Sequence, residues 1–320
     1  MNGTGAASPS DYPHLMQSLW MLFASFMFAL MGVCVKLASD LYSTSEIVMY
    51  RGIIGMSLLG TFAYLQGGTM KTALPWHHLW RGLIGVIALW LWFRAISLIP
   101  LPTAVTLNYM APIWMALILF IGGLAARQRG LEWSLIIAIL MSFAGVTLLL
   151  RPSVQGGQSM GALFGLMSGF LSALAYLQVR KLGHLGEPEY RVVFYFSLTG
   201  VLTGLVGSFL ERPLDGDVFR PHSGLGLLLL AGIGITATTA QVAMTRAYRL
   251  GNVLLSANLQ YTGIIFSSIL GILIWDDRLD GLGWLGMVLI LISGMTATYY
   301  NVRGTPSPAP SAASTSPESK

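Results

Sequence analysis

Runs of roughly 20 apolar residues recur along the whole chain, and they constrain its fold more than any other feature. Each run is long enough to cross the hydrocarbon core of a bilayer, which is about 30 Å thick. Hydrophobic residues make up 54% of the 320 residues and charged residues only 10%, whereas soluble domains carry about 25% charged residues. The sequence therefore predicts an integral membrane protein whose main partner is the lipid bilayer.

The apolar character of these runs is continuous, whereas the strands of a transmembrane barrel alternate apolar and polar residues. We therefore predict an all-α protein with ten transmembrane helices. The connections between them are too short or too rich in Gly and Pro to form a soluble domain. The spans are predicted at 17–37, 45–65, 79–99, 102–121, 131–150, 159–179, 191–210, 224–245, 252–273 and 281–300.

Lys and Arg side chains fall unevenly on the two sides of this arrangement, which predicts its orientation. One side receives eleven of them, Arg81 included, and the other receives five. We therefore expect a multi-pass protein of the cytoplasmic (inner) membrane with both termini in the cytoplasm. Residues 1–16 read as a short cytoplasmic segment without a signal peptide, and the Pro- and Ser-rich residues 302–320 as a disordered tail.

An internal repeat divides the chain into 17–151 and 157–301. The segment FRAISLIPLPTAVTLNYMAPIW aligns with TRAYRLGNVLLSANLQYTGIIF at a spacing of 152 residues, so that Tyr109 meets Tyr261 and Asn108 meets Gln260. Five helices per half is an odd number, so the second half enters the membrane inverted. Inverted repeats are typical of secondary transporters, where two halves rock about a site near the midplane.

These segments, together with ILIWDDRLDGLGWLGMVLILISG, resemble the two recurrent parts of an EamA domain of the drug/metabolite transporter (DMT) superfamily. The resemblance implies a five-plus-five inverted arrangement with a cavity lined mainly by the third, fourth, eighth and ninth helices. It also implies an acidic residue after the fourth helix of each half. The second half has Asp276 and Asp277 there, but the first half reads GGLAARQRGLEW with Glu132 displaced.

Uncharged polar side chains near the middle of the fourth and ninth spans are the first candidates for substrate binding. Amide and phenol groups from both halves would hydrogen-bond a ligand between them. Bonding between neighbouring helices explains such residues equally well, and both interpretations stay open. The candidates are Asn108, Tyr109, Asn258, Gln260 and Tyr261.

Charged groups at membrane depth cost roughly 2.5 to 3.5 kcal/mol each on insertion scales and are functional candidates for that reason. Arg51 and Arg94 are such groups, and Trp90 lies one turn from Arg94. Their positive charge would suit a carboxylate-bearing ligand, although snorkelling to the headgroups is the alternative. Glu46 lies close enough in sequence to pair with Arg51.

Two further residues belong to the predicted site. Pro112 removes the backbone hydrogen bond to the Asn108 carbonyl, so it should kink or hinge the fourth helix there. Gln241 is a cavity candidate on the eighth span. The glycines at 161, 165 and 169 form a double GxxxG that indicates close packing within the chain, or else a homodimer.

The predicted spans lack the residues that catalysis or metal binding would require. All five histidines and every acidic residue lie outside the spans or in a first helical turn, and Cys34 is the single cysteine. We therefore predict no enzyme activity, no cofactor and no metal. The scattered basic residues form no patch for nucleic acid. A membrane enzyme and a non-transporting scaffold remain the alternative functions.

The favoured function is a secondary transporter or exporter of a small organic metabolite, working by alternating access. Among EamA proteins the chain is similar to the branch of S-adenosylmethionine carriers and metabolite exporters, and the positive charge of Arg51 and Arg94 suits an amino acid. The predicted substrate is therefore an amino acid or a molecule like S-adenosylmethionine.

Overall fold

A computed structural model describes residues 13–99, 101–125, 133–150, 159–210, 218–275 and 280–304. All regular secondary structure in these ranges is helical. The helices are α1 (Pro13–Ala38), α2 (Thr44–Leu65), α3 (Pro75–Leu98), α4 (Leu101–Asn108), α5 (Ala111–Ala125), α6 (Trp133–Leu150), α7 (Ser159–His184), α8 (Glu189–Leu210), α9 (Gly224–Leu250), α10 (Val253–Gln260), α11 (Thr262–Trp275) and α12 (Gly281–Gly304).

Each predicted span coincides with helical structure, and two spans are interrupted. The fourth comprises α4 and α5, and the ninth comprises α10 and α11. Six helical segments in the described ranges are long and apolar enough to cross a membrane, and three further apolar helices are shorter. The six are Leu15–Ala38, Thr44–Leu65, Ser159–His184, Glu189–Leu210, Gly224–Leu250 and Val253–Ile274.

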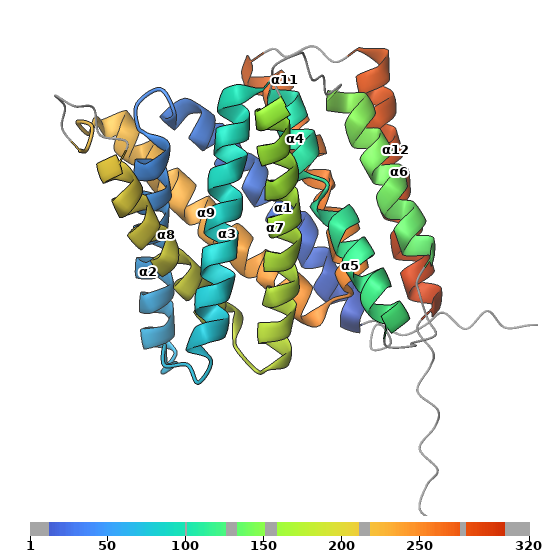
Figure 1. Cartoon of the computed structure of the whole chain (residues 1–320), viewed down its shortest axis with the longest axis horizontal. Helices are drawn as coiled ribbons and strands as arrows, with labels where there is room; N and C mark the ends of the chain where they lie inside the picture. The colour runs from blue at the N-terminus through green and yellow to red at the C-terminus, as the bar shows by residue number, and fades with distance from the viewer. Residues whose placement is uncertain are drawn as a thin grey trace, which may run out of the picture.

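The tightest helix pairs each join one helix from the first half of the chain to one from the second. α1 packs along α9, α3 along α7, α2 along α8, and α6 along α12. Figure 1 shows α6 and α12 together at one edge of the bundle and α2 and α8 toward the other. The two halves are therefore interleaved, and groups from both can meet in the middle of the bundle.

The small-residue stripe of α7 is used within the chain. A side-chain carbon at Gly161 would lie 2.6 Å from the side chain of Ile99, and one at Gly169 would lie 2.7 Å from the carbonyl of Leu107. α7 therefore lies directly against the end of α3 and against α4. This confirms the interpretation of the double GxxxG as close packing between helices of the chain.

Replacing Gly169 by alanine is expected to lower the thermal midpoint of the detergent-solubilised protein by several degrees. The added methyl group would meet backbone oxygens that cannot move independently, and overpacking of this kind costs about 1–3 kcal/mol. Gly122→Ala is the matched control, since nothing lies within 4 Å of its new carbon. A midpoint for Gly169→Ala equal to that of the control would contradict this contact.

A polar cluster ties the connection between α2 and α3 to the start of α8. Glu187 accepts hydrogen bonds from Thr72 (2.6 Å) and Arg191 (3.0 Å), and His78 lies 3.4 Å away. Burial raises the pKa of the Glu187 carboxyl, but the hydrogen bonds from Thr72 and Arg191 and the charge of Arg191 outweigh it and hold the pKa below its usual value. Glu187 is thus an ionised anchor of this connection.

Candidate functional site

The fourth predicted span breaks at Tyr109 and Met110, between α4 and α5. Pro112 has no N–H to donate to the Asn108 carbonyl, and the Met110 N–H bonds instead to Leu107, three residues back (3.2 Å). The break predicted from Pro112 is therefore present. The Asn108 carbonyl faces α7, where a side-chain carbon on Gly169 would lie 3.1 Å from it.

The ninth span breaks at the matching residue, Tyr261, although it has no proline. Ile264, which stands 152 residues after Pro112, donates its N–H to the Tyr261 carbonyl (3.1 Å). The Gln260 carbonyl accepts the hydroxyl of Ser25 on α1 (3.4 Å). Matching carbonyls in the two halves thus face a helix of the other half, Asn108 towards α7 and Gln260 towards α1.

A cluster of tyrosines surrounds Gln260 between these breaks. Tyr248 donates its hydroxyl to Gln260 Oε1 (2.9 Å), and Gln260 Nε2 donates to the hydroxyl of Tyr176 (3.4 Å). The rings of Tyr176 and Tyr248 stack with centroids 5.2 Å apart, and those of Tyr109 and Tyr261 lie 6.1 Å apart. We call Tyr109, Tyr176, Tyr248, Gln260 and Tyr261 the tyrosine–glutamine cluster.

The members of this cluster differ in exposure and in hydrogen bonding. Tyr248 and Tyr261 are fully buried, whereas Tyr109, Tyr176 and Gln260 keep partial exposure. The hydroxyl of Tyr261 is buried without a hydrogen-bond partner. An unsatisfied buried phenol costs about 1–3 kcal/mol. The Tyr261 hydroxyl is therefore free to form a further hydrogen bond. The cluster therefore offers polar contacts from α7, α9 and the breaks in the fourth and ninth spans.

The two asparagine candidates bond to neighbouring helices. Asn108 Nδ2 donates to the hydroxyl of Ser168 (2.7 Å), which in turn donates to the carbonyl of Ala88 (2.9 Å). Asn258 Oδ1 accepts the hydroxyl of Ser142 (2.8 Å), while its Nδ2 is buried without a partner. The contacts that the structure gives to Asn108 thus correspond to helix-to-helix bonding, and Asn258 has a donor left for a ligand.

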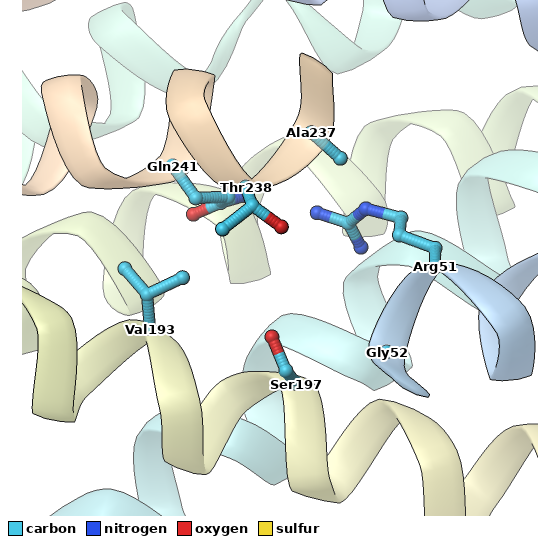
Figure 2. A pocket seen from close by; sticks show the side chains of 7 residues that line it. All are labelled: Arg51, Gly52, Val193, Ser197, Ala237, Thr238 and Gln241. Atoms are coloured by element: carbon cyan, nitrogen blue, oxygen red, sulfur yellow. The ribbon is translucent and has the colours of Figure 1, made fainter. Parts of the chain in front are cut away.

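Arg51 and Gln241 lie together in a pocket between α2, α8 and α9. Figure 2 shows the guanidinium of Arg51 pointing towards Thr238 and Ser197, with Gln241 beyond Thr238 on the same helix. Gln241 Oε1 is buried and accepts no hydrogen bond. The two candidates, which the sequence places on separate spans, are therefore brought to one pocket.

Glu46 does not pair with Arg51, which corrects that expectation. One carboxylate oxygen of Glu46 accepts the N–H of Ser43 (2.8 Å) in a capping box at the start of α2, and the other accepts the N–H of Arg220 (2.7 Å). A carboxylate that closes a helix N-terminus in this way is held at the helix end, while Arg51 lies two turns further along.

Trp90 and Arg94 lie elsewhere. The ring of Trp90 packs against Gly207 of α8. At 1.5 Å per residue, Gly207 lies about 16 Å along that helix from Phe196, whose ring contacts the Arg51 guanidinium. Arg94 is exposed on α3. The structure therefore does not bring Trp90 or Arg94 to the pocket of Arg51, and a role for them in binding stays a prediction.

Arg81 is a further candidate for the site that the sequence alone did not indicate. The charge count assigned it to the cytoplasmic side, yet it is 3% exposed. Its guanidinium lies 4.4 Å from the centre of the Phe196 ring, and that of Arg51 lies 5.4 Å from the same ring. Gly85 makes room for it, since a side-chain carbon there would collide with Arg81 Nη1. The missed signal is this glycine one helical turn after the arginine.

Metal-ligating residues do not come together in the part of the chain that the structure describes. No three His, Cys, Asp or Glu side chains form a group there that would hold an ion. The acidic residues that the family resemblance pointed to, Asp276 and Asp277, and the displaced Glu132 lie outside the described residues.

Comparison with known proteins gives matches over nearly the whole chain. The model of the EamA-like transporter family matches residues 15–151 and 159–298. An uncharacterized transporter of Helicobacter pylori is 30% identical, with 86% of this chain and 91% of that protein covered. The pseudopaline exporter CntI of Pseudomonas aeruginosa is 31% identical, with 85% and 92% covered. One solved crystal structure is 18% identical with a TM-score of 0.77, and the match covers 89% of this chain and 99% of that chain.

Proposed function

Because the chain belongs to the EamA-like transporter family, we propose that it is a secondary transporter or exporter of a small organic metabolite, working by alternating access. The relative whose name is pseudopaline exporter supports a small organic molecule as cargo. We propose an amino acid or a molecule like S-adenosylmethionine, moved across the cytoplasmic (inner) membrane, with both termini in the cytoplasm.

The proposed architecture is ten transmembrane helices in two inverted repeats of five. It is supported by the matching breaks. α4 and α10 each contain eight residues, begin 152 residues apart and end one residue before Tyr109 and Tyr261. The first helix of the first half, α1, packs along the third helix of the second half, α9. In the same way the first helix of the second half, α7, packs along the third helix of the first half, α3. An odd number of helices per repeat then requires opposite orientations in the membrane.

One observation carries the proposed site: both interrupted spans bring their break to the tyrosine–glutamine cluster. A break in a membrane helix frees backbone groups and allows the two segments to tilt separately, which is why discontinuous helices line the sites of many transporters. The rings of Tyr109 and Tyr261, one from each break, lie 6.1 Å apart. A ligand between them would contact both repeats, and tilting of one repeat would open the site to one side.

The test is transport in proteoliposomes. A thermal-shift screen of amino acids, nucleosides, vitamins and polyamines first identifies a stabilising ligand, because only a bound ligand shifts the unfolding equilibrium. The exchange of that labelled ligand across the vesicle membrane is then measured.

Replacing Tyr109 and Tyr261 together by alanine is expected to lower the exchange rate at least tenfold while the protein still inserts. Both rings lie at the breaks, so the variant removes the aromatic contacts of the site from each repeat. The matched control replaces Tyr50 and Tyr64 by alanine. These lie on α2, outside the cluster. Exchange by the Tyr109 and Tyr261 variant at the rate of the control would refute the site, and the absence of any exchange by the unaltered protein would refute transport.

A further inference from the structure

Two arginines from different helices share one aromatic ring in this protein; Arg81 is buried and Arg51 is partly exposed. The guanidinium of Arg81 on α3 and that of Arg51 on α2 both lie against Phe196 of α8. Arg51 lies about 10 Å along α2 from its first residue and Arg81 about 9 Å along α3 from its first residue, at 1.5 Å per residue. Because α2 and α3 are consecutive spans, the two side chains approach Phe196 from opposite ends of the bundle.

Neither arginine has a counter-charge among the described residues. Arg51 Nε and Arg81 Nε and Nη1 are buried without a hydrogen-bond partner. The carboxylates of the described ranges that form ion pairs do so elsewhere, Glu187 with Arg191 and His78, and Glu189 with Arg249. Glu46 is held by backbone N–H groups. The guanidinium groups therefore keep free donors.

The phenylalanine ring does not compensate for the removal of these two charges from water. A cation–π contact contributes about 0.5–2 kcal/mol, whereas the effective cost of burying one ion is several kcal/mol. The two positive charges also repel each other. An anion that contacts both guanidinium groups would remove both penalties, and a guanidinium presents its N–H groups in a fork that matches the two oxygens of a carboxylate.

We propose that Arg51 and Arg81 bind the carboxylate of the transported molecule, so that its substrates are carboxylate-bearing organic metabolites. This inference rests on the proposed function and names the substrate class of that site. Arg81 on α3 and Tyr176 on α7 belong to two helices that pack along each other, and Tyr176 bonds to Gln260. The arginine pair and the tyrosine–glutamine cluster therefore lie on neighbouring helices.

The pocket around Arg51 favours an organic acid over an inorganic anion. Its lining includes the hydroxyl-bearing Ser197 and Thr238, and Gln241, whose buried Oε1 accepts no hydrogen bond. Chloride and a bare carboxylate have no donor for that oxygen. The pocket has room for about one water molecule in this conformation; once it opens, a metabolite that carries a carboxylate together with an ammonium, amide or hydroxyl group would satisfy Arg51 and Gln241 together.

The experiment measures thermal midpoints of the purified full-length protein with defined probes at constant ionic strength. The probes are glutamate, serine, succinate and citrate, with neutral succinamide, chloride and inorganic phosphate beside them. At least one carboxylate is expected to raise the midpoint in a saturable manner, whereas succinamide does not. In Arg81→Gln and Arg51→Gln the apparent dissociation constant should rise at least tenfold. Arg81→Lys should recover part of the binding, because it restores the charge without the fork.

Arg246→Gln is the matched control, because it removes the same charge from a guanidinium that already has a partner, Gln17 (2.9 Å). It should bind the carboxylate as the unaltered protein does. A second measurement needs no ligand: Arg81→Met should leave the midpoint of the ligand-free protein equal or higher, since it removes an uncompensated buried charge, whereas Arg246→Met should lower it. A clear loss of ligand-free stability in Arg81→Met would mean that Arg81 is structural and would overturn the proposal.

Three further outcomes would overturn it. These are the absence of stabilisation by any carboxylate, stabilisation that persists in both arginine variants, and equal, arginine-dependent stabilisation by chloride or phosphate. Failure of the proposed function looks different. Arginine-dependent carboxylate binding without exchange in proteoliposomes would keep the anion site and refute transport. Exchange of a ligand without a carboxylate at an unchanged rate in Arg81→Gln would keep transport and refute the anion site.

Discussion

Replacing Gln260 by leucine is expected to destabilise the protein and to abolish transport. The amide of Gln260 joins the hydroxyl groups of Tyr248 on α9 and Tyr176 on α7. Leucine would leave two phenol groups without a partner inside the bundle, at about 1–3 kcal/mol each. The thermal midpoint in detergent should fall by several degrees, and the exchange of the screened ligand should become undetectable.

A double-mutant cycle separates this network from simple loss of packing. Tyr248→Phe removes one partner of Gln260 and keeps the ring that stacks on Tyr176. If the hydrogen bond couples the two residues, Gln260→Leu should cost less in the Tyr248→Phe background than in the unaltered protein, by about 0.5–3 kcal/mol. Strictly additive effects would show that the hydrogen bond from Tyr248 to Gln260 does not contribute to stability, and full exchange by Gln260→Leu would remove Gln260 from the site.

The break in the fourth span illustrates what the sequence predicts well. Inside a helix a proline lacks the N–H donor and its ring clashes with the carbonyl four residues back, so Pro112 predicts a break next to Asn108 without knowledge of the neighbours, and the break lies at Tyr109 and Met110. The positions of the helices follow equally from local composition, since a run of about 20 apolar residues needs only the bilayer to become a helix.

The break at Tyr261 shows where prediction from the sequence ends. No residue there forbids a continuous helix, and the interruption involves a hydrogen bond from Ser25, 235 residues earlier in the chain. The burial of Arg81 was not predicted for the same reason. Its burial depends on Phe196 and on the space beside Gly85, whereas a count of charges near helix ends treats it as a residue at the membrane surface. Both features depend on contacts between the two halves, and no window of sequence contains them.

Asn108 and Gln260 occupy equal positions in the repeat and yet have different surroundings. Asn108 is used to bond α4 to Ser168 of α7, whereas Gln260 bonds two tyrosines of the cluster. The repeat predicted that these two side chains hydrogen-bond a ligand from both halves, and this stays a prediction. It could not predict that one side chain bonds between helices and the other takes part in the cluster, because that depends on whether a hydroxyl or a ring lies opposite.

A disulfide between positions 25 and 263 is expected to stop transport completely and reversibly. A side-chain carbon at Gly263 would lie 3.6 Å from Cβ of Ser25 and 3.2 Å from the hydroxyl of Tyr109, and disulfides join Cβ atoms about 3.5–4.5 Å apart. Cysteines introduced at both positions in a Cys34→Ser background should therefore bond on oxidation with little strain.

The link would fasten α1 of one half to α11 of the other beside the break in the ninth span. Alternating access requires the two halves to move against each other, so the oxidised protein should bind its ligand and fail to exchange it, and a reductant should restore exchange. The two single-cysteine variants control for oxidation elsewhere. Undiminished exchange by fully cross-linked protein would mean that α1 and α11 move as one body, and that the motion occurs between other helices, such as α2 against α8, which pack along each other at the edge of the bundle.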